Sequence, residues 1–303
     1  MLVPLDGSEL AESVFVYAKE LAARLDLELT LLHVCGPEER DLVPMYQSYV
    51  EQAAETLRYQ SREAGEAIGI ETERNGSRAR GELVVGHPAD EIARYADGND
   101  MDLIMMATHG RSGIGRWAMG SVADKVLHAS RVPVWLVRAG VANMVAYDKW
   151  PQRTILVPLD GSEVAESVLP HVEELARQRD SELVDVVIFR VCEYAAVPDD
   201  GSNAEPSGWE IGLRREISQA RRSAEKYLAR IEQRFTAARI RARSDVLVGQ
   251  AAEAIADYAN AQQFGLVAMA THGRSGLSRL AFGSVAEKVL QGLSCPLFLV
   301  RPG

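Results

Sequence analysis

The chain has 303 residues, of which 47% are hydrophobic and 25% charged, and its formal net charge is −10 at pH 7. This length favours two globular domains, and the acidic balance argues against nucleic-acid binding, which needs basic surface to meet phosphate backbones. No apolar stretch approaches the roughly 20 residues of a membrane span, and Met1 leads straight into Leu2–Leu5 with no room for a signal peptide, so we expect a cytoplasmic protein.

The first half of the chain predicts strands that alternate with helices. In chain order, the expected elements are strand Leu2–Leu5, helix Glu9–Leu25, strand Glu28–Val34, helix Tyr46–Ile68, strand Ile70–Asn75, helix Pro88–Ala96, strand Leu103–Ala107, helix Ser121–Ala129 and strand Val132–Val137. Several of these strands are nearly continuous apolar runs, which is typical of a parallel sheet covered by helices on both faces.

Two motifs of this first half occur again in the second. Val3–Glu9 reappears as Val157–Glu163, and Ala107–Gly113 reappears as Ala270–Gly276. A repeat of this length is a duplicated domain rather than a solenoid unit. We therefore predict one domain over residues 1–140, a linker over 141–153 and a second domain over 154–303.

The two copies differ in two segments. The first copy is expected to carry an insertion around Asn75–Glu82, near its third strand. The second carries Glu193–Gly212, rich in Pro, Gly, Asp and Ser, after its second strand. This segment fits either an inert loop or a mobile flap at the second copy's ligand edge. Our hypothesis is that it gates the second site and so makes the two sites unequal.

The chain has three cysteines, Cys35, Cys192 and Cys295, at wide spacing. An odd number so far apart suits neither a disulfide framework nor a zinc site. We expect reduced, half-buried thiols.

Each half also contains a glycine-bearing loop between an apolar strand and a helix that opens with Gly-Ser, at Gly120-Ser121 and Gly283-Ser284. The first amides of a helix lack intrahelical partners and lie at the positive end of its dipole, so they suit an anion. In an open α/β sheet, ligands bind beyond the carboxyl ends of the strands. The ends of the first strand, at Asp6 and Asp160, should lie at the same edge. The sequence therefore predicts a phosphate cradle in each half.

These pieces resemble the universal stress protein family over nearly the whole chain, as a tandem pair. ATP-binding members of that family carry G-x2-G-x9-G-(S/T) after the fourth strand. Here the spacing is kept as Ala107-x2-Gly110-x9-Gly120-Ser121 and as Ala270-x2-Gly273-x9-Gly283-Ser284, with alanine in place of the first glycine. The resemblance implies two flavodoxin-like (Rossmann-like, HUP-type) α/β domains, each a five-stranded parallel sheet sandwiched by helices.

The resemblance further implies an adenine nucleotide as ligand, ATP with Mg²⁺ held only through its phosphates. Asp6 and Asp160 would contact the adenosine, with the backbone of Leu5, Val34, Leu159 and Val191 around the base. The phosphates would be held by Gly110, Gly120, Ser121 and Val122, and by Gly273, Gly283, Ser284 and Val285. The implied set also includes Pro4, Met106, Ala107, Pro158, Met269 and Ala270.

Local alternatives stay open for several of these residues. Asp6 followed by Glu9 also matches a helix capping box, and Ser121 can either cap its helix or donate to a phosphate. Arg111 and Arg274 are either phosphate neighbours or solvated side chains. The residues expected in loop or surface roles are His109, His272, Lys125 and Lys288.

No Walker loop, nucleophile elbow or metal-ligand cluster is found in the sequence, so we assign no catalytic residue and expect slow ATP hydrolysis at most. The expected role is a nucleotide-dependent regulator of stress or energy state, with an unidentified protein partner. The rival readings are a weak ATPase and a nucleotide-independent interaction module. The last strands, Val132–Val137 and Cys295–Val300, are apolar and would be exposed edges in isolated domains, which invites pairing. The resemblance implies that the two domains meet through these edges about a pseudo-twofold axis. Further dimerisation of the tandem chain is also plausible.

Overall fold

The computed structural model describes residues 1–67, 78–108, 119–138, 154–177, 184–194, 208–271 and 283–302. The first half contains, in order, β1 (Leu2–Leu5), α1 (Glu9–Glu12), α2 (Phe15–Leu25), β2 (Leu29–Cys35), the 3-10 helix η1 (Pro37–Leu42), α3 (Val43–Ala67), β3 (Ala79–Val85), α4 (Pro88–Gly98), β4 (Ile104–Ala107), α5 (Ser121–Ala129) and β5 (Val134–Val137). The second half contains β6 (Thr154–Pro158), α6 (Glu163–Glu166), α7 (Leu169–Ala176), β7 (Asp185–Cys192), α8 (Gly208–Ala237), β8 (Arg241–Val248), α9 (Ala251–Ala261), β9 (Leu266–Ala270), α10 (Ser284–Gly292) and β10 (Leu297–Val300). The predicted linker, residues 141–153, lies outside the described residues.

All the described strands form one ten-stranded sheet in the order β3-β2-β1-β4-β5-β10-β9-β6-β7-β8. Within each half the strands are parallel, and each half has the strand order 3-2-1-4-5. This is the Rossmann order, whereas flavodoxin has the order 2-1-3-4-5. Two tandem Rossmann-like α/β domains are therefore confirmed.

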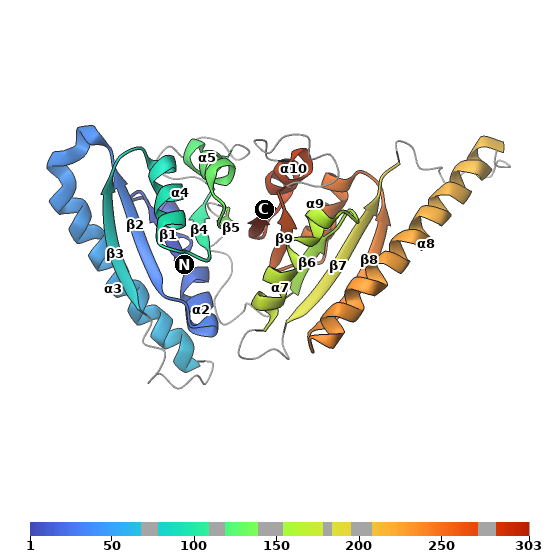
Figure 1. The fold of residues 1–303 in the computed structure, drawn as a ribbon, viewed down its shortest axis with the longest axis horizontal. Coiled ribbons are helices and arrows are strands. Elements are labelled where there is room, and N and C mark those ends of the chain that lie inside the picture. Colours follow the sequence, from blue (N-terminus) through green and yellow to red (C-terminus); the bar gives the residue numbers. More distant parts are fainter. Residues whose placement is uncertain are drawn as a thin grey trace.

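Helices cover both faces of this sheet (Figure 1). One face packs against α2, α3, α7 and α8, and the other against α4, α5, α9 and α10. Alternate residues of one strand enter the two cores, as Val3 and Leu2 of β1 do. Burial on both faces is why the central strands are continuous apolar runs in the sequence.

The two halves meet where β5 pairs antiparallel with β10. Trp135 lies opposite Phe298, and each is the second residue of its strand, so the pseudo-twofold axis passes through this pair. Their ring centroids are 6.0 Å apart and the ring planes are inclined by 65°. Arg138 donates across the junction to the carbonyl of Leu293, and Arg301 donates to that of His128. The predicted pairing of the two domains through their last strands is confirmed.

Two predicted elements need comment. The expected strand Ile70–Asn75 lies outside the described residues, and the strand that pairs with β2 is Ala79–Val85, which includes part of the predicted insertion. This strand lies at the edge of the sheet and is half-exposed, so it tolerates Arg80 and Glu82, and charges on an edge strand discourage pairing with other chains. The predicted helix Glu9–Leu25 is divided into α1 and α2 at Ser13, whose hydroxyl donates to the carbonyl of Leu10.

The predicted flap Glu193–Gly212 is also corrected at its end. Gly208–Gly212 form the first turns of α8, a helix of 30 residues. Residues 195–207, which make up most of the predicted flap, lie outside the described residues.

The three cysteines are free thiols, as predicted. Cys35 and Cys192 are buried rather than half-buried, and burial raises the pKa of both. At the start of β10, burial raises the pKa of Cys295 to about 12. All three are therefore protonated near pH 7, which makes them poor nucleophiles.

His171 lies at the domain junction, where its ring centroid is 6.1 Å from that of Phe298. Burial lowers its pKa, and the nearby Glu174 opposes this only in part. The unfolded chain, with a histidine pKa of about 6.5, therefore binds more protons than the folded chain below that pH. The contribution of neutral His171 to stability is complete above about pH 6.5 and is lost as the pH falls through its lower folded pKa.

We accordingly expect the free energy of unfolding to fall from pH 7.5 to pH 5.5 more steeply in the wild type than in His171→Gln. Urea unfolding followed by circular dichroism at the two pH values measures this difference. The exposed His87 provides the control, since His87→Gln should retain the wild-type pH dependence. Equal pH dependence in His171→Gln and the wild type would contradict this account of the junction.

Candidate functional site

Each half has a cavity at the carboxyl ends of its strands. The first cavity has a volume of about 220 Å³. It is bordered by the ends of β1, β2 and β4 and by the starts of α4 and α5. Its lining residues are Pro4, Leu5, Asp6, Ala11, Leu32, Val34, Pro88, Ile92, Met106, Ala107, Thr108, Gly120, Ser121, Val122 and Ala123.

The second cavity has a volume of about 670 Å³ and occupies the equivalent place. It is bordered by β6, β7 and β9, by α9 and α10, and in addition by α8. Its lining residues are Pro158, Leu159, Asp160, Ala165, Phe189, Arg190, Val191, Cys192, Glu193, Tyr194, Ala220, Ser223, Ala251, Ile255, Met269, Ala270, Thr271, Gly283, Ser284, Val285 and Ala286.

Every predicted site residue that the structure describes lines one of these two cavities. Gly110 and Gly273 lie outside the described residues, as do His109, His272, Arg111 and Arg274. Lys125 and Lys288 are exposed and line neither cavity. The structure thus brings together the ends of the first, second and fourth strands with the helix that follows the fourth strand.

Sequence reasoning missed several lining residues. Thr108 and Thr271 lie inside the repeated motifs, and Ala11 and Ala165 lie two residues after them, so the repeat itself could have indicated all four. Pro88 and Ala251 begin the helix that follows the third strand, so their position at this edge was available from the topology. No sequence pattern indicated Ala220 and Ser223 of α8 as lining residues, because they reach the cavity only through the packing of a long helix on the sheet.

A tight turn holds the aspartate at the end of the first strand. The Oδ1 atom of Asp6 accepts hydrogen bonds from the amide of Ser8 at 3.0 Å and from its hydroxyl at 2.6 Å. Ser8, in turn, caps α1 by accepting from the amide of Ala11. The capping-box interpretation of Asp6 is therefore wrong, because the cap is Ser8. Gly7 has φ of 81°, a conformation that favours glycine, and this turn places the Asp6 carboxylate at the cavity.

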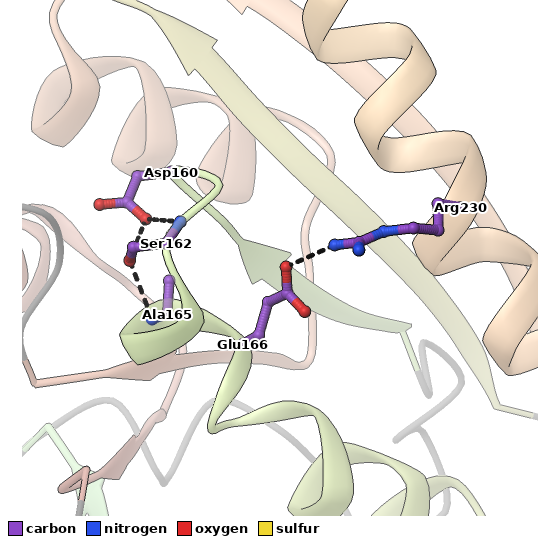
Figure 2. A network of polar contacts seen from close by, with 5 residues as sticks. All are labelled: Asp160, Ser162, Ala165, Glu166 and Arg230. Atoms are coloured by element: carbon purple, nitrogen blue, oxygen red, sulfur yellow. Dashed lines mark hydrogen bonds and ion pairs between the residues drawn. The ribbon is translucent and has the colours of Figure 1, made fainter.

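The second half repeats this arrangement (Figure 2). Asp160 Oδ1 accepts from the amide and hydroxyl of Ser162 at 2.9 and 2.6 Å, and the Ser162 hydroxyl accepts from the amide of Ala165 at 3.1 Å. One carboxylate oxygen in each half is thus fixed by its own turn.

Figure 2 also shows a contact that ties α6 to the long helix α8. Glu166 Oε1 accepts from Arg230 Nη2 at 2.8 Å. The Arg230 side chain is 66% exposed, so this ion pair adds at most about 1 kcal/mol to stability. The main effect of this ion pair is to hold α8 in position beside the cavity. In the first half, the equivalent Glu12 accepts from the hydroxyl of Tyr49 on α3.

The helix after the fourth strand begins without a side-chain cap in either half. Gly120 is the N-cap of α5, and its amide donates to the carbonyl of Thr108 at 2.8 Å. Gly283 is the N-cap of α10 and donates to Thr271 in the same way. Ser121 is therefore the first helical residue and not the cap. The first intrahelical donor of α5 is Asp124, so the amides of residues 121–123 have no partner within the helix; these three residues line the cavity at the positive end of the helix dipole.

The described residues hold no group of three or more His, Cys, Asp or Glu side chains that could bind a metal ion. Likewise, no helix within the described ranges has the length and apolar character needed to cross a membrane. What the two cavities offer is a carboxylate at one end, an uncapped helix N-terminus at the other, and an apolar wall between them.

Comparison with known proteins identifies the family of this chain. A model of the Universal stress protein family matches residues 1–138 and again residues 152–301. A universal stress protein of Mycobacterium tuberculosis is 25% identical over 309 residues, which cover 99% of this chain and 96% of that protein. A universal stress protein of Methanocaldococcus jannaschii is 27% identical over 150 residues, which cover 49% of this chain and 82% of that protein.

Two crystal structures share the fold over the whole chain. A universal stress protein from Archaeoglobus fulgidus has a TM-score of 0.67 at 22% identity, covering 100% of this chain and 98% of its own. A functionally unknown protein from Pseudomonas aeruginosa has a TM-score of 0.65 at 14% identity, covering 99% and 92%. Because the family model matches both halves almost completely, the chain belongs to the universal stress protein family.

Proposed function

We infer that this protein binds an adenine nucleotide, ATP with Mg²⁺ on its phosphates, in one or both halves, and that it acts as a nucleotide-dependent regulator of stress or energy state. The observation that carries this inference is the uncapped N-terminus of α5 and of α10, each bordering a cavity that has an aspartate at its other end. A helix N-terminus of this kind binds phosphate through backbone amides and its dipole.

The roles of the lining residues follow from their chemistry. The aspartate carboxylate, Asp6 or Asp160, would accept hydrogen bonds from the nucleoside, which carries hydroxyl and amino donors. Val34 or Val191, at the end of the second strand, would offer its backbone to the base. The amides that follow Gly120 or Gly283 would hold the phosphates, and the hydroxyl of Ser121 or Ser284 would donate to a phosphate oxygen.

Mg²⁺ would reach the site on the nucleotide, where it neutralises phosphate charge. The residues described around the two cavities contribute oxygen atoms singly rather than as a cluster of metal ligands. Ala107 and Ala270 border the cavities with a methyl group where a glycine would leave more room. Nucleotide occupancy would then act on a partner through the order of the segments around the cavity, as ligands do when they favour one conformation.

The test introduces a negative charge where the phosphates are proposed to bind. The double variant Ser121→Asp/Ser284→Asp should weaken ATP binding at least about 100-fold, since each carboxylate would repel the phosphates; this corresponds to about 2.8 kcal/mol. Aspartate in the first turn of a helix is favourable, so the fold should be retained. Isothermal titration calorimetry with ATP and Mg²⁺ measures the affinity.

The matched control is Ser48→Asp/Ser218→Asp, which adds the same charge at two exposed helix positions away from the cavities and should bind like the wild type. A wild-type protein that releases no nucleotide on denaturation and shows no thermal shift with ATP and Mg²⁺ would favour a nucleotide-independent interaction module. Hydrolysis of ATP well above background that disappears in the double variant would instead favour a weak ATPase.

A further inference from the structure

The two cavities differ in volume, and the difference lies on the side formed in the second half by β7 and α8. The first has a volume of about 220 Å³ and the second about 670 Å³. Sites for small molecules usually have volumes of roughly 300–1,000 Å³, so only the second lies in this range. The additional lining of the second cavity comes from the end of β7 and from α8, and consists of Arg190, Cys192, Glu193, Tyr194, Ala220 and Ser223.

The two long helices can be aligned through their contacts with equivalent glutamates. Tyr49 of α3 donates to Glu12 at 2.8 Å. Tyr227 of α8 lies beside Glu166, which contributes with burial to raising the pKa of Tyr227. In this alignment, three residues of the first half correspond to smaller ones in the second: Leu42, Met45 and Tyr46 correspond to Ala220, Ser223 and Ala224.

In the first half this space is filled. The ring of Tyr46 stacks on that of His33, with centroids 4.0 Å apart and planes inclined by 25°. The Tyr46 hydroxyl donates to Glu39 Oε1 at 3.2 Å, and Glu39 Oε2 accepts from the amide of Gly36 at 3.3 Å. The 3-10 helix η1 is thereby held against the end of β2. Tyr46 is 4% exposed, so it fills this end of the first half with a packed side chain.

A backbone carbonyl beside this packed ring also accepts a hydrogen bond. His33 Nδ1 lies 3.0 Å from the carbonyl oxygen of Leu5, which can only accept, so the Nδ1–H donates. Leu5 lines the first cavity beside Asp6 and belongs to the backbone proposed to surround the base. The first half therefore uses one of its base-facing carbonyls internally.

The second half has a cation at the corresponding position. Pro4 pairs with Leu32 and Pro158 with Phe189, so Arg190 corresponds to His33. The Arg190 guanidinium lies over the ring of Tyr227 at 5.2 Å and lines the cavity. Glu193 Oε1 accepts from the amide of Ala251 at 3.1 Å, so this carboxylate satisfies the start of α9. The second cavity thus combines greater room with a guanidinium that an anionic ligand could contact, and the one additional carboxylate of its lining is engaged at the start of α9.

We propose that the chain binds one nucleotide, in its second half, and that the first half is a narrowed copy in which Tyr46 occupies the space that Ala224 leaves in the second half. This proposal rests on the proposed function, since it assigns the nucleotide to one of two candidate sites. Ala220 and Ser223 of α8 line the second site and leave it open, whereas Tyr46 of α3 packs on His33 at the end of β2 and narrows the first.

Titration of the full chain with ATP and Mg²⁺ should give a stoichiometry of one nucleotide per chain. Ser284→Asp alone should abolish this binding, whereas Ser218→Asp, on the exposed part of α8, should leave it unchanged. In the wild type, amide hydrogen exchange should slow on ATP addition at residues 284–286 and stay constant at residues 121–123.

A second pair of variants tests why the site is open. Ala220→Leu/Ser223→Met restores the side chains that the first half carries and should weaken ATP binding at least tenfold. Ala229→Leu/Ser218→Met makes similar changes on exposed positions of the same helix and should bind like the wild type. Unchanged affinity in the first of these variants would overturn the role assigned to α8.

The outcomes separate this inference from the function on which it rests. A stoichiometry of two, or exchange protection at residues 121–123, would overturn the inference while supporting nucleotide binding. Failure of the wild type to bind ATP in the titration would overturn both. A stoichiometry of one that is lost in Ser284→Asp supports both.

Discussion

Replacing Trp135 with alanine should lower the free energy of unfolding by about 3–5 kcal/mol, the usual cost of truncating a fully buried tryptophan. Trp135 is 1% exposed and lies on the pseudo-twofold axis against Phe298. Its side chain belongs to the core layer that continues from one half to the other. The cavity left by the substitution would therefore weaken the contact between the halves as well as the first half itself. Urea unfolding measures the loss, and we expect the transition to become broader or to divide into two steps.

The chain offers a matched control in Trp209, which is 64% exposed on the first turn of α8. Trp209→Ala makes the same chemical change and should alter the free energy of unfolding by no more than about 0.5 kcal/mol. If Trp135→Ala and Trp209→Ala had similar effects, the two halves would not depend on a shared core.

Replacing Gly81 with alanine should also destabilise the fold strongly. A Cβ atom at Gly81 would lie 2.6 Å from the carbonyl carbon of Val50 and 2.8 Å from the amide nitrogen of Glu51. These are backbone atoms of α3, which cannot turn aside as a side chain can. The helix would have to move away from β3, and we expect a loss of about 3 kcal/mol, at the upper end of the usual cost of overpacking. Thermal and urea unfolding give the measurement.

Gly98 provides the control for this second substitution. It is the last residue of α4, and a Cβ atom there would meet no atom within 4 Å. Gly98→Ala should leave stability unchanged or raise it by about 0.5 kcal/mol, because alanine is the better helix former. A mild effect at Gly81 as well would show that α3 is held less closely against the sheet than the structure indicates.

The parts of the fold that were predictable are those in which a residue's environment follows from its neighbours in sequence. Strand Leu2–Leu5 and helix Ser121–Ala129 were predicted to the residue, because continuous apolar runs and a Gly-Ser helix start carry the information locally. The third strand was missed because an edge strand with Arg80 and Glu82 on it has the composition of a loop. Its pairing with β2, from Leu29–Ala79 to Cys35–Val85, depends on the fold rather than on the strand itself.

The candidate site was also predictable only in those parts that short sequence motifs determine. Its two repeated motifs predicted the aspartate and the helix start, since both are fixed by short turns. The motif around Asp6 fitted two local roles, and only the geometry showed that Ser8 is the cap and that Asp6 faces the cavity. The segment Glu193–Gly212 led to the hypothesis that the two sites are unequal, but the difference in volume between the two cavities was beyond the sequence. It depends on which residues of α3 and α8 face the sheet, and that register is set by contacts between residues far apart, such as Tyr49 with Glu12.

The antiparallel pairing of β5 with β10 has a consequence for how the chain can assemble further. Each half uses its last strand in this seam, so the outermost strands of the ten-stranded sheet are β3 and β8. Both carry charged side chains, among them Arg80 and Glu82 on β3 and Arg241 and Arg243 on β8, which oppose the addition of a strand from another chain. An assembly of several chains would therefore be built through the helical faces rather than by lengthening the sheet.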